Sequence, residues 1–286
     1  MLTATLNLTS GLVSNPGEGV NLNLDWPADR PVPLAQLDEL ASQLRQQGVT
    51  DLVAIGAHIQ IEEAKAVALG LRYAGPLSDL AKAKVEPYSA ANLSVVLAGT
   101  CGGSELIPQC SFFDSERGFL RSVRMPRCDI TYIDRAELKA AVGTGFSCLI
   151  RLLELSVAPG VPAGLRACSR ALFDQGAMGT LALDEVAWQG ANLIGLIHRL
   201  SRPQLPLTYI AQIAAAKGRE GNLDAAYLLA AQLLFSEDAS TLAEIAQRAG
   251  VRPLKLTPAS EKQIVDKVAG LRLSYTLNPL GGKLHG

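Results

Sequence analysis

The sequence predicts an α+β protein in which a small mixed β/α N-terminal portion packs on a predominantly α-helical C-terminal portion. Near the N-terminus, apolar residues alternate with polar ones. Strand-like and helix-like apolar runs then alternate as far as residue 134, and from residue 135 onward every apolar run has helical spacing. We therefore expect a mixed portion over residues 1–134 and a helical portion over 135–286, either as two domains or as one continuous domain.

In the N-terminal portion, the period-two alternation on both sides of "SNPGEG" predicts two strands joined as a hairpin with a long loop. The prolines of "PADRPVP" end the second strand, because they cannot donate a ladder hydrogen bond. Helical spacing predicts helices over Leu34–Gln47 and Ile61–Tyr73. Further strands are expected over "VTDLVAIGA", Leu93–Ala98 and Cys128–Asp134.

In the C-terminal portion, Pro and Gly residues separate a series of apolar runs that each predict a helix. The expected helices are Arg135–Val157, Ala163–Asp174, Leu181–Leu200, Leu207–Lys217, Leu223–Phe235, Leu242–Ala249 and Ser260–Leu271.

The composition indicates a protein that has more apolar residues than its core needs, so that some of them lie on the surface. Of 286 residues, 48% are hydrophobic and 19% are charged, against roughly 25% charged in ordinary soluble domains. Such a surface is commonly buried against another subunit, so we expect a homo-oligomer. The "TATLNL" segment and the "TLNPLGGKLHG" tail are the arms expected to exchange between subunits.

Charge and hydropathy limit the expected location and partners. The net charge of −1 provides no overall attraction to nucleic acid or membranes. No apolar run approaches the roughly 20 residues that a spanning helix needs, and "MLTATLNLTSG" lacks the basic start of a signal peptide. With five cysteines in no C-x-x-C pair, we predict reduced thiols and a cytoplasmic protein, or one inside a virus-like particle or filament.

Neither a metal nor a cofactor is predicted. There are only three histidines, and neither G-x-G-x-x-G nor the Walker pattern occurs. The acidic pairs fall in the first turns of expected helices, where negative charge complements the helix dipole, so they are not assigned acid–base roles. These pairs are Glu62/Glu63, Asp184/Glu185 and Glu237/Asp238.

The glycine-rich segment "GTCGGSE" follows an expected strand and offers one candidate site. Its backbone N–H groups suit an anion nest, with Cys101 as a nucleophile. His58 also follows an expected strand and is the best available base. The alternative is a strand-end turn whose glycines supply positive φ and whose cysteine packs inward.

The segment "SFFDSERGFLRSVRMPRCD" interleaves arginines with phenylalanines and offers another candidate site. Guanidinium groups bind phosphates, and aromatic rings stack on bases, so the pattern suits single-stranded nucleic acid or another polyanion. If the segment is helical, three of the arginines share one face; otherwise it is a solvated loop with salt bridges between subunits. The residues assigned to nucleic-acid binding are Arg117, Arg121, Arg124, Arg127, Phe112, Phe113, Phe119, Arg199 and Arg202.

The segment Ser240–Pro253 resembles the first helix and turn of a bacterial helix-turn-helix protein, through Leu242, Ile245, Ala246, Ala249, Gly250 and Val251. The resemblance implies a recognition helix directly after the turn. Pro253 and Pro258 stand where that helix would run.

Taken together, these features predict a non-enzymatic self-assembling protein, such as a coat, nucleocapsid-like or filament subunit, with possible RNA binding through the Arg/Phe segment. The alternative hypothesis is an α/β small-molecule enzyme that uses Cys101 on its glycine-rich loop. A further alternative is a DNA-binding protein of the helix-turn-helix type.

Overall fold

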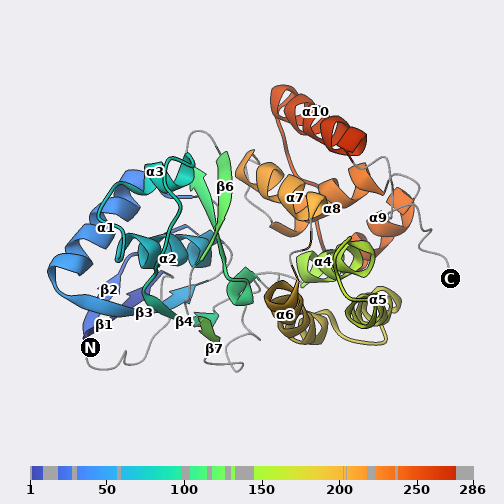
Figure 1. Cartoon of the computed structure of the whole chain (residues 1–286). Coiled ribbons are helices and arrows are strands. Elements are labelled where there is room, and N and C mark those ends of the chain that lie inside the picture. The colour runs from blue at the N-terminus through green and yellow to red at the C-terminus, as the bar shows by residue number, and fades with distance from the viewer. Residues whose placement is uncertain are drawn as a thin grey trace. The chain divides into compact units, whose positions relative to one another are not determined.

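The structure is a computed structural model of the chain (Figure 1). It describes residues 2–8, 19–27, 31–56, 59–97, 104–114, 118–125, 130–132, 145–201, 203, 205–217, 223–235 and 238–274. The chain divides into two compact units, Met1–Val142 and Gly143–Gly286. The predicted boundary after residue 134 falls outside the described residues and stays a prediction.

The N-terminal unit contains a five-stranded sheet in the order β2-β1-β3-β4-β7, and every neighbouring pair is parallel. Its strands are β1 (Leu2–Asn7), β2 (Val20–Asn23), β3 (Val49–Gly56), β4 (Asn92–Leu97) and β7 (Ile130–Tyr132). The predicted hairpin between the first two strands is therefore wrong. Period-two alternation does not distinguish parallel from antiparallel pairing, and the connection between β1 and β2 is long enough for a crossover.

Helices cover one face of this sheet. Figure 1 shows α1 (Leu34–Gln46) beside α2 (Ile59–Gly70), and both contact β3. The strands alternate accordingly: Ala4, Leu6 and Leu8 are fully buried, while the residues between them are partly exposed. Helix α2 is buried from Gln60 to Gly70, so it is the central helix of this unit.

A short helix, α3 (Leu77–Ala81), and a 3₁₀ turn, η1 (Ser104–Leu106), precede an antiparallel hairpin of β5 (Gln109–Asp114) and β6 (Gly118–Arg124). The hairpin contacts α2. Glu62 of α2 accepts a hydrogen bond from the backbone N–H of Ser111 and forms a 2.7 Å ion pair with Lys65, which is fully buried. A buried ammonium requires such a partner, so this pair connects α2 to the hairpin.

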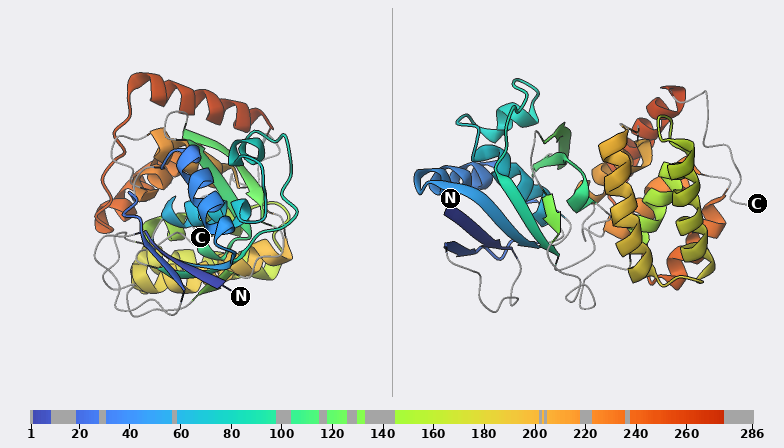
Figure 2. Two further views of the ribbon diagram at one scale, coloured as in Figure 1. Left: turned by 90° about the vertical axis from the view of Figure 1, so that its left-hand side faces the viewer. Right: turned by 60° about the horizontal axis from the view of Figure 1, so that its bottom comes forward.

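The C-terminal unit is helical in its described parts, and Figure 2 shows its helices from two sides. They are α4 (Phe146–Val157), α5 (Ala163–Met178), α6 (Leu183–Leu200), α7 (Pro206–Lys217), α8 (Leu223–Leu234), α9 (Ala239–Arg248) and α10 (Pro258–Ser274). Helix α4 is buried from Phe146 to Leu155 and contacts α5, α6, α7 and α8. It begins after Gly145, whose φ of 73° and close approach to the Leu183 carbonyl exclude a side chain.

The predicted mixed architecture is confirmed in its broad form, as a mostly helical chain with a small β/α portion at the N-terminus. The class is corrected from α+β to α/β, because the five-stranded sheet is parallel and helices connect β2 to β3 and β3 to β4. Within the described ranges, no helix is both long and apolar enough to cross a membrane.

Candidate functional site

The parallel sheet brings the carboxyl ends of its strands to one edge. The chain leaves β1 toward β2 on one side, whereas it leaves β3 toward β4 on the other side. The connections therefore diverge between the ends of β1 and β3, where Asn7 is paired with Ile55 in the register. In open α/β sheets, ligands bind in the crevice outside the carboxyl ends at such a topological switch point.

Gln60, in the first turn of α2, satisfies buried backbone carbonyl groups at this point with hydrogen bonds. Its side-chain amide Nε2 donates to the carbonyl of Leu8 at 2.7 Å and also to the carbonyl of Trp26. The Leu8 N–H in turn donates to the carbonyl of Ile55 at 2.9 Å. The start of α2, the end of β1 and the segment after β2 are thus joined by a buried amide, which is 1% exposed.

Gly56, the last residue of β3, lies in very close contact with these groups. A Cβ at this position would lie 3.1 Å from Gln60 Cβ and 3.3 Å from Leu8 Cδ1. Glycine therefore permits the close packing of the strand end against the start of α2. Helix α2 begins three residues later, at Ile59, and the dipole at a helix N-terminus makes it a suitable position for an anionic group such as a phosphate.

Glu63 is a buried carboxyl group one turn further along α2. Its Oε1 accepts a 2.7 Å hydrogen bond from the N–H of Val32. Burial raises the pKa of Glu63 to about 8, and the Val32 hydrogen bond opposes this. Glu63 is thus mainly protonated at pH 7, so the expectation that it complements the helix dipole is not met. Its Oε2 and the indole Nε1 of Trp26 are both buried, with no hydrogen-bond partner among the described residues.

Asp25 follows β2 at the same edge of the sheet. It is exposed and adopts a φ of 45°, a left-handed conformation that non-glycine residues seldom adopt. Strain of this kind concentrates at ligand-binding positions. The sequence did not assign Asp25, Gln60 or Glu63 to a site, because the order of the strands is what brings them to one edge.

His58 and Cys101, the predicted base and nucleophile, lie outside the described residues. The strands that precede them are adjacent, and Gly56 of β3 is paired with Leu97 of β4 in the register. His58 follows Gly56 by two residues, and Cys101 follows Leu97 by four. The strand ends that precede them in the sequence are therefore adjacent at the carboxyl edge of the sheet.

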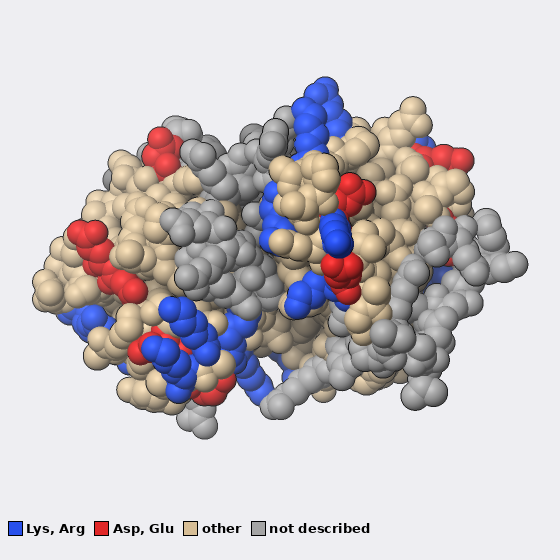
Figure 3. Space-filling model, turned by 90° about the horizontal axis from the view of Figure 1, so that it is seen from above, with Lys and Arg blue, Asp and Glu red and all other residues tan. Residues whose placement is uncertain are grey.

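The Arg/Phe segment forms the β5–β6 hairpin rather than a helix. Arg121 makes a 2.7 Å ion pair with Glu86, and Phe112 and Phe113 are buried. Arg124 and Arg199 are exposed. Figure 3 shows Lys and Arg side chains beside Asp and Glu side chains in several places on the visible face. Arg117, Arg127, Arg202 and the side chain of Phe119 lie outside the described residues, and nucleic-acid binding stays a prediction.

The C-terminal unit contains a buried polar cluster around α4. Ser147, Arg151 and Glu154 are spaced so that they share one face of this helix, and each is at most 4% exposed. Glu154 accepts hydrogen bonds from the N–H of Leu207 at 2.7 Å and from the hydroxyl of Thr208 at 2.6 Å. Two charged residues, Arg151 and Glu154, that interrupt the apolar run of α4 were the sequence signal for this cluster.

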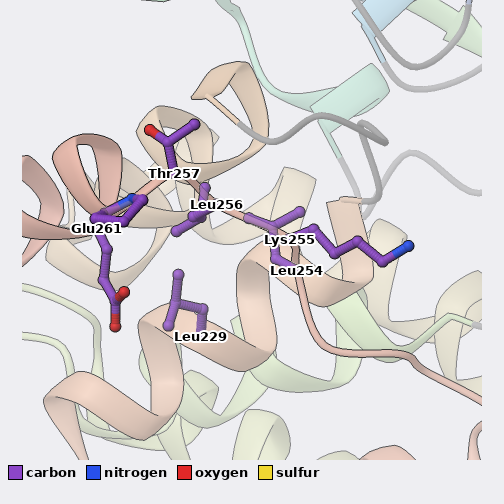
Figure 4. Close-up of a pocket in the computed structure, with 7 residues that line it drawn as sticks. Leu229, Leu254, Lys255, Leu256, Thr257 and Glu261 are labelled. Atoms are coloured by element: carbon purple, nitrogen blue, oxygen red, sulfur yellow. The ribbon is translucent and has the colours of Figure 1, made fainter.

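The same unit has a cavity of about 640 Å³ between α8 and the start of α10. It is lined by Leu229, Leu254, Lys255, Leu256, Thr257, Pro258 and Glu261. In Figure 4, the three leucines lie together, and the ammonium group of Lys255 points away from them. The cavity is therefore mainly apolar.

The segment that resembles a helix-turn-helix protein forms α9 and the chain after it. The next helix, α10, begins only at Pro258, and residues 251–257 are not helical. No recognition helix directly follows the turn.

Comparison with known proteins identifies the fold. No protein-family model matches the sequence, and no curated protein is similar to it. Several solved structures are similar. An iron-containing alcohol dehydrogenase from Thermotoga maritima has a TM-score of 0.71 at 12% identity, covering 94% of this chain and 85% of that one. An NADH-dependent butanol dehydrogenase A from the same organism has a TM-score of 0.68 at 14% identity, covering 99% and 86%.

A third similar structure is the sulfoacetaldehyde reductase of Bifidobacterium kashiwanohense in complex with NAD+, with a TM-score of 0.67 at 13% identity, covering 93% of this chain and 84% of that one. The chain thus has the fold of the iron-containing alcohol dehydrogenases. This likeness contradicts the prediction of a coat, nucleocapsid-like or filament protein, and it favours the alternative of an α/β enzyme. A charge-poor composition occurs in a large two-unit enzyme as well as in an assembly subunit, so it does not distinguish between these two classes of protein.

Proposed function

We propose that this protein is an oxidoreductase that binds a nicotinamide dinucleotide at the carboxyl edge of its parallel sheet and acts on a small molecule. The observation that carries the proposal is the strand order, whose switch point lies between the ends of β1 and β3. The printed names of two structural neighbours include NADH and NAD+, which supports this choice of ligand.

The residues at the switch point fit a dinucleotide. Gly56 leaves no room for a side chain between the strand end and α2, so the chain can turn closely under a phosphate. The N-terminus of α2 lies at the same edge, and its helix dipole suits a pyrophosphate. The indole Nε1 of Trp26, in the segment after β2, is a buried hydrogen-bond donor with no partner among the described residues. A bound nicotinamide would supply hydride transfer.

Asp25 is the residue that we assign to the ribose. In doubly wound sheets, a carboxylate about twenty residues after the first strand's turn accepts a hydrogen bond from the ribose 2′-hydroxyl of NAD. Asp25 follows the second strand at a comparable distance and is exposed. Its negative charge would repel the 2′-phosphate of NADP, so we propose a preference for NAD(H).

A calorimetric titration with NADH tests the proposal. We expect saturable binding by the full chain with one site per subunit, and weaker binding of NADPH. The matched variant is Gly56→Val, whose side chain would collide with Gln60 and Leu8. Loss of NADH binding in this variant, with an unchanged unfolding transition of the N-terminal unit, supports the site. Absence of saturable binding of either nucleotide to the natural protein contradicts the proposal.

A second candidate is nucleophilic catalysis by Cys101 with His58 as its base. The register that pairs Gly56 with Leu97 favours it, because both residues then follow adjacent strand ends. An activated thiolate would react with iodoacetamide faster than an ordinary cysteine near neutral pH. The exposed Cys168 is the internal reference for this comparison.

A further inference from the structure

Some of the structural neighbours are named as iron-containing enzymes. We therefore asked which residues of this chain could bind iron. Iron in enzymes is held mainly by imidazole and carboxylate groups with open positions for the substrate. The whole sequence has only three histidines. Across the described ranges, no three His, Cys, Asp or Glu side chains lie close enough together to hold a metal ion.

The carboxylates of the buried cluster in the helical unit are already engaged by helix ends. Both oxygens of Glu154 accept hydrogen bonds from the first turn of α7: Oε1 from the N–H of Leu207, and Oε2 from the N–H and hydroxyl of Thr208. Asp224 Oδ1 accepts a 2.7 Å hydrogen bond from the N–H of Ser147 at the start of α4. Metal binding through these oxygens would break hydrogen bonds that satisfy buried helix termini.

Arg151 supplies the positive charge of this cluster. Its side chain is on the same face of α4 as Glu154, and the residue is 4% exposed. Burial raises the pKa of Glu154 to about 7, while hydrogen bonds from α7 and the charge of Arg151 oppose the rise. The charge of Arg151 likewise opposes the burial-raised pKa of Tyr227 on α8. A guanidinium whose charge acts on both groups would repel a divalent cation in the same cluster.

We infer that the guanidinium of Arg151 replaces a metal ion as the fixed cation of this buried cluster, so that the protein folds and acts without iron or another divalent metal. The inference does not depend on nucleotide binding in the N-terminal unit. It separates this chain from the iron-dependent chemistry that the names of its neighbours suggest.

Metal analysis of the purified protein tests the inference first. We would incubate the full chain anaerobically with Fe²⁺, Zn²⁺ or Co²⁺, remove unbound metal by gel filtration, and measure bound metal by mass spectrometry and thermal unfolding with and without each ion. We expect far less than one equivalent of metal and no change in Tm. Retention of close to one equivalent of any of these ions, with a rise in Tm, would overturn the inference.

Removal of the cation tests its role directly. In Arg151→Met the buried Glu154 loses its compensating charge, and breaking such a pair should lower the Tm by roughly 10 °C. Arg170→Met is the matched control, because Arg170 pairs with Asp174 on a partly exposed face, where we expect a change of at most a few degrees. Equal effects of the two substitutions would show that Arg151 has no special electrostatic role.

The pH dependence distinguishes charge compensation from packing. Among the described residues, Arg151 and Tyr227 interact electrostatically with Glu154, Cys148 interacts with Tyr227, and Asp224 binds the start of α4 through Ser147. Without Arg151 the pKa of Glu154 rises further, so folding takes up more protons and the loss in Tm should be larger at pH 8 than at pH 6. The double variant Arg151→Met/Glu154→Gln should recover most of the loss at pH 8. A loss that is independent of pH and is not recovered would contradict the inference.

Discussion

The side-chain amide of Gln60 donates a 2.7 Å hydrogen bond to the carbonyl of Leu8, joining the first turn of α2 to the end of β1 where the strand order reverses. This hydrogen bond holds the start of α2 against the end of β1, next to the proposed nucleotide site. It also completes the hydrogen bonding of a strand end that would otherwise be buried with an unsatisfied carbonyl.

Replacement of Gln60 by Leu should destabilise the N-terminal unit. The change leaves the carbonyls of Leu8 and Trp26 without their donor, and two unsatisfied buried acceptors cost about 2–5 kcal/mol of unfolding free energy. Urea denaturation measures this loss. Gln43→Leu is the control, because its amide contacts Glu39 at an exposed position. If the two variants are equally stable, the Gln60 network does not support the fold.

The stability of the N-terminal unit should fall as the pH rises, because of Glu63. Its pKa is raised from 4.5 to about 8 by burial, so the folded state binds more protons than the unfolded state between these values. The stabilisation of the neutral form is present below about pH 4.5 and is lost as the pH rises toward 8.

Glu63→Gln keeps an oxygen for the Val32 N–H and cannot ionise. At pH 8–9 we expect this variant to be more stable than the natural protein by a few kcal/mol at most. At pH 5 the difference should be small or reversed. Urea denaturation across this pH range provides the measurement, and parallel curves for the two proteins would contradict the assigned pKa.

Asp25→Ser should change nucleotide preference without changing the fold. Removal of the carboxylate eliminates the hydrogen-bond acceptor for the ribose, so NADH should bind several-fold less tightly. It also eliminates the electrostatic repulsion of a 2′-phosphate, so NADPH should bind more tightly. Asp51→Asn is the matched control, because Asp51 lies near the amino end of β3, where it contacts Asn92. Unchanged affinities in Asp25→Ser would remove Asp25 from the site.

The cysteines should differ widely in reactivity. Burial raises the pKa of the Cys110 thiol well above its usual value, and Cys148 is also buried, whereas Cys168 is exposed. Brief alkylation of the native protein followed by peptide mass spectrometry should label Cys168 and spare Cys110 and Cys148. Labelling of Cys101 faster than Cys168 would support the nucleophile hypothesis, and equal or slower labelling would contradict it.

The sequence predicted most helices because their apolar faces repeat along continuous segments, as in α1 and α6. It failed where structure depends on distant pairing. The alternation in β1 and β2 was correct for strands but did not show that Ala4 pairs in parallel with Val20. The sequence left the Arg/Phe segment open between a helix and a solvated loop, whereas the structure is a hairpin that places Phe112 opposite Arg121.

The candidate site was harder to predict than the elements around it. The strands that precede His58 and Cys101 could be predicted from sequence alone, because a glycine or polar residue follows each apolar run. The roles of Gln60 and Glu63 depend on which strand neighbours which, and periodicity carries no such information. Arg151 and Glu154 were visible as charges that interrupt an apolar run, but their significance follows only from burial against α7 and α8.

Hydrogen–deuterium exchange of the full chain with and without saturating NADH tests the central proposal most directly. We predict slower exchange in peptides that contain Leu8, Trp26 and Gln60, at the switch point of the sheet. The peptide around the cavity that contains Leu229 should exchange at the same rate with and without NADH. Unchanged exchange at the ends of β1 and β3 in the presence of bound NADH would contradict the proposed site.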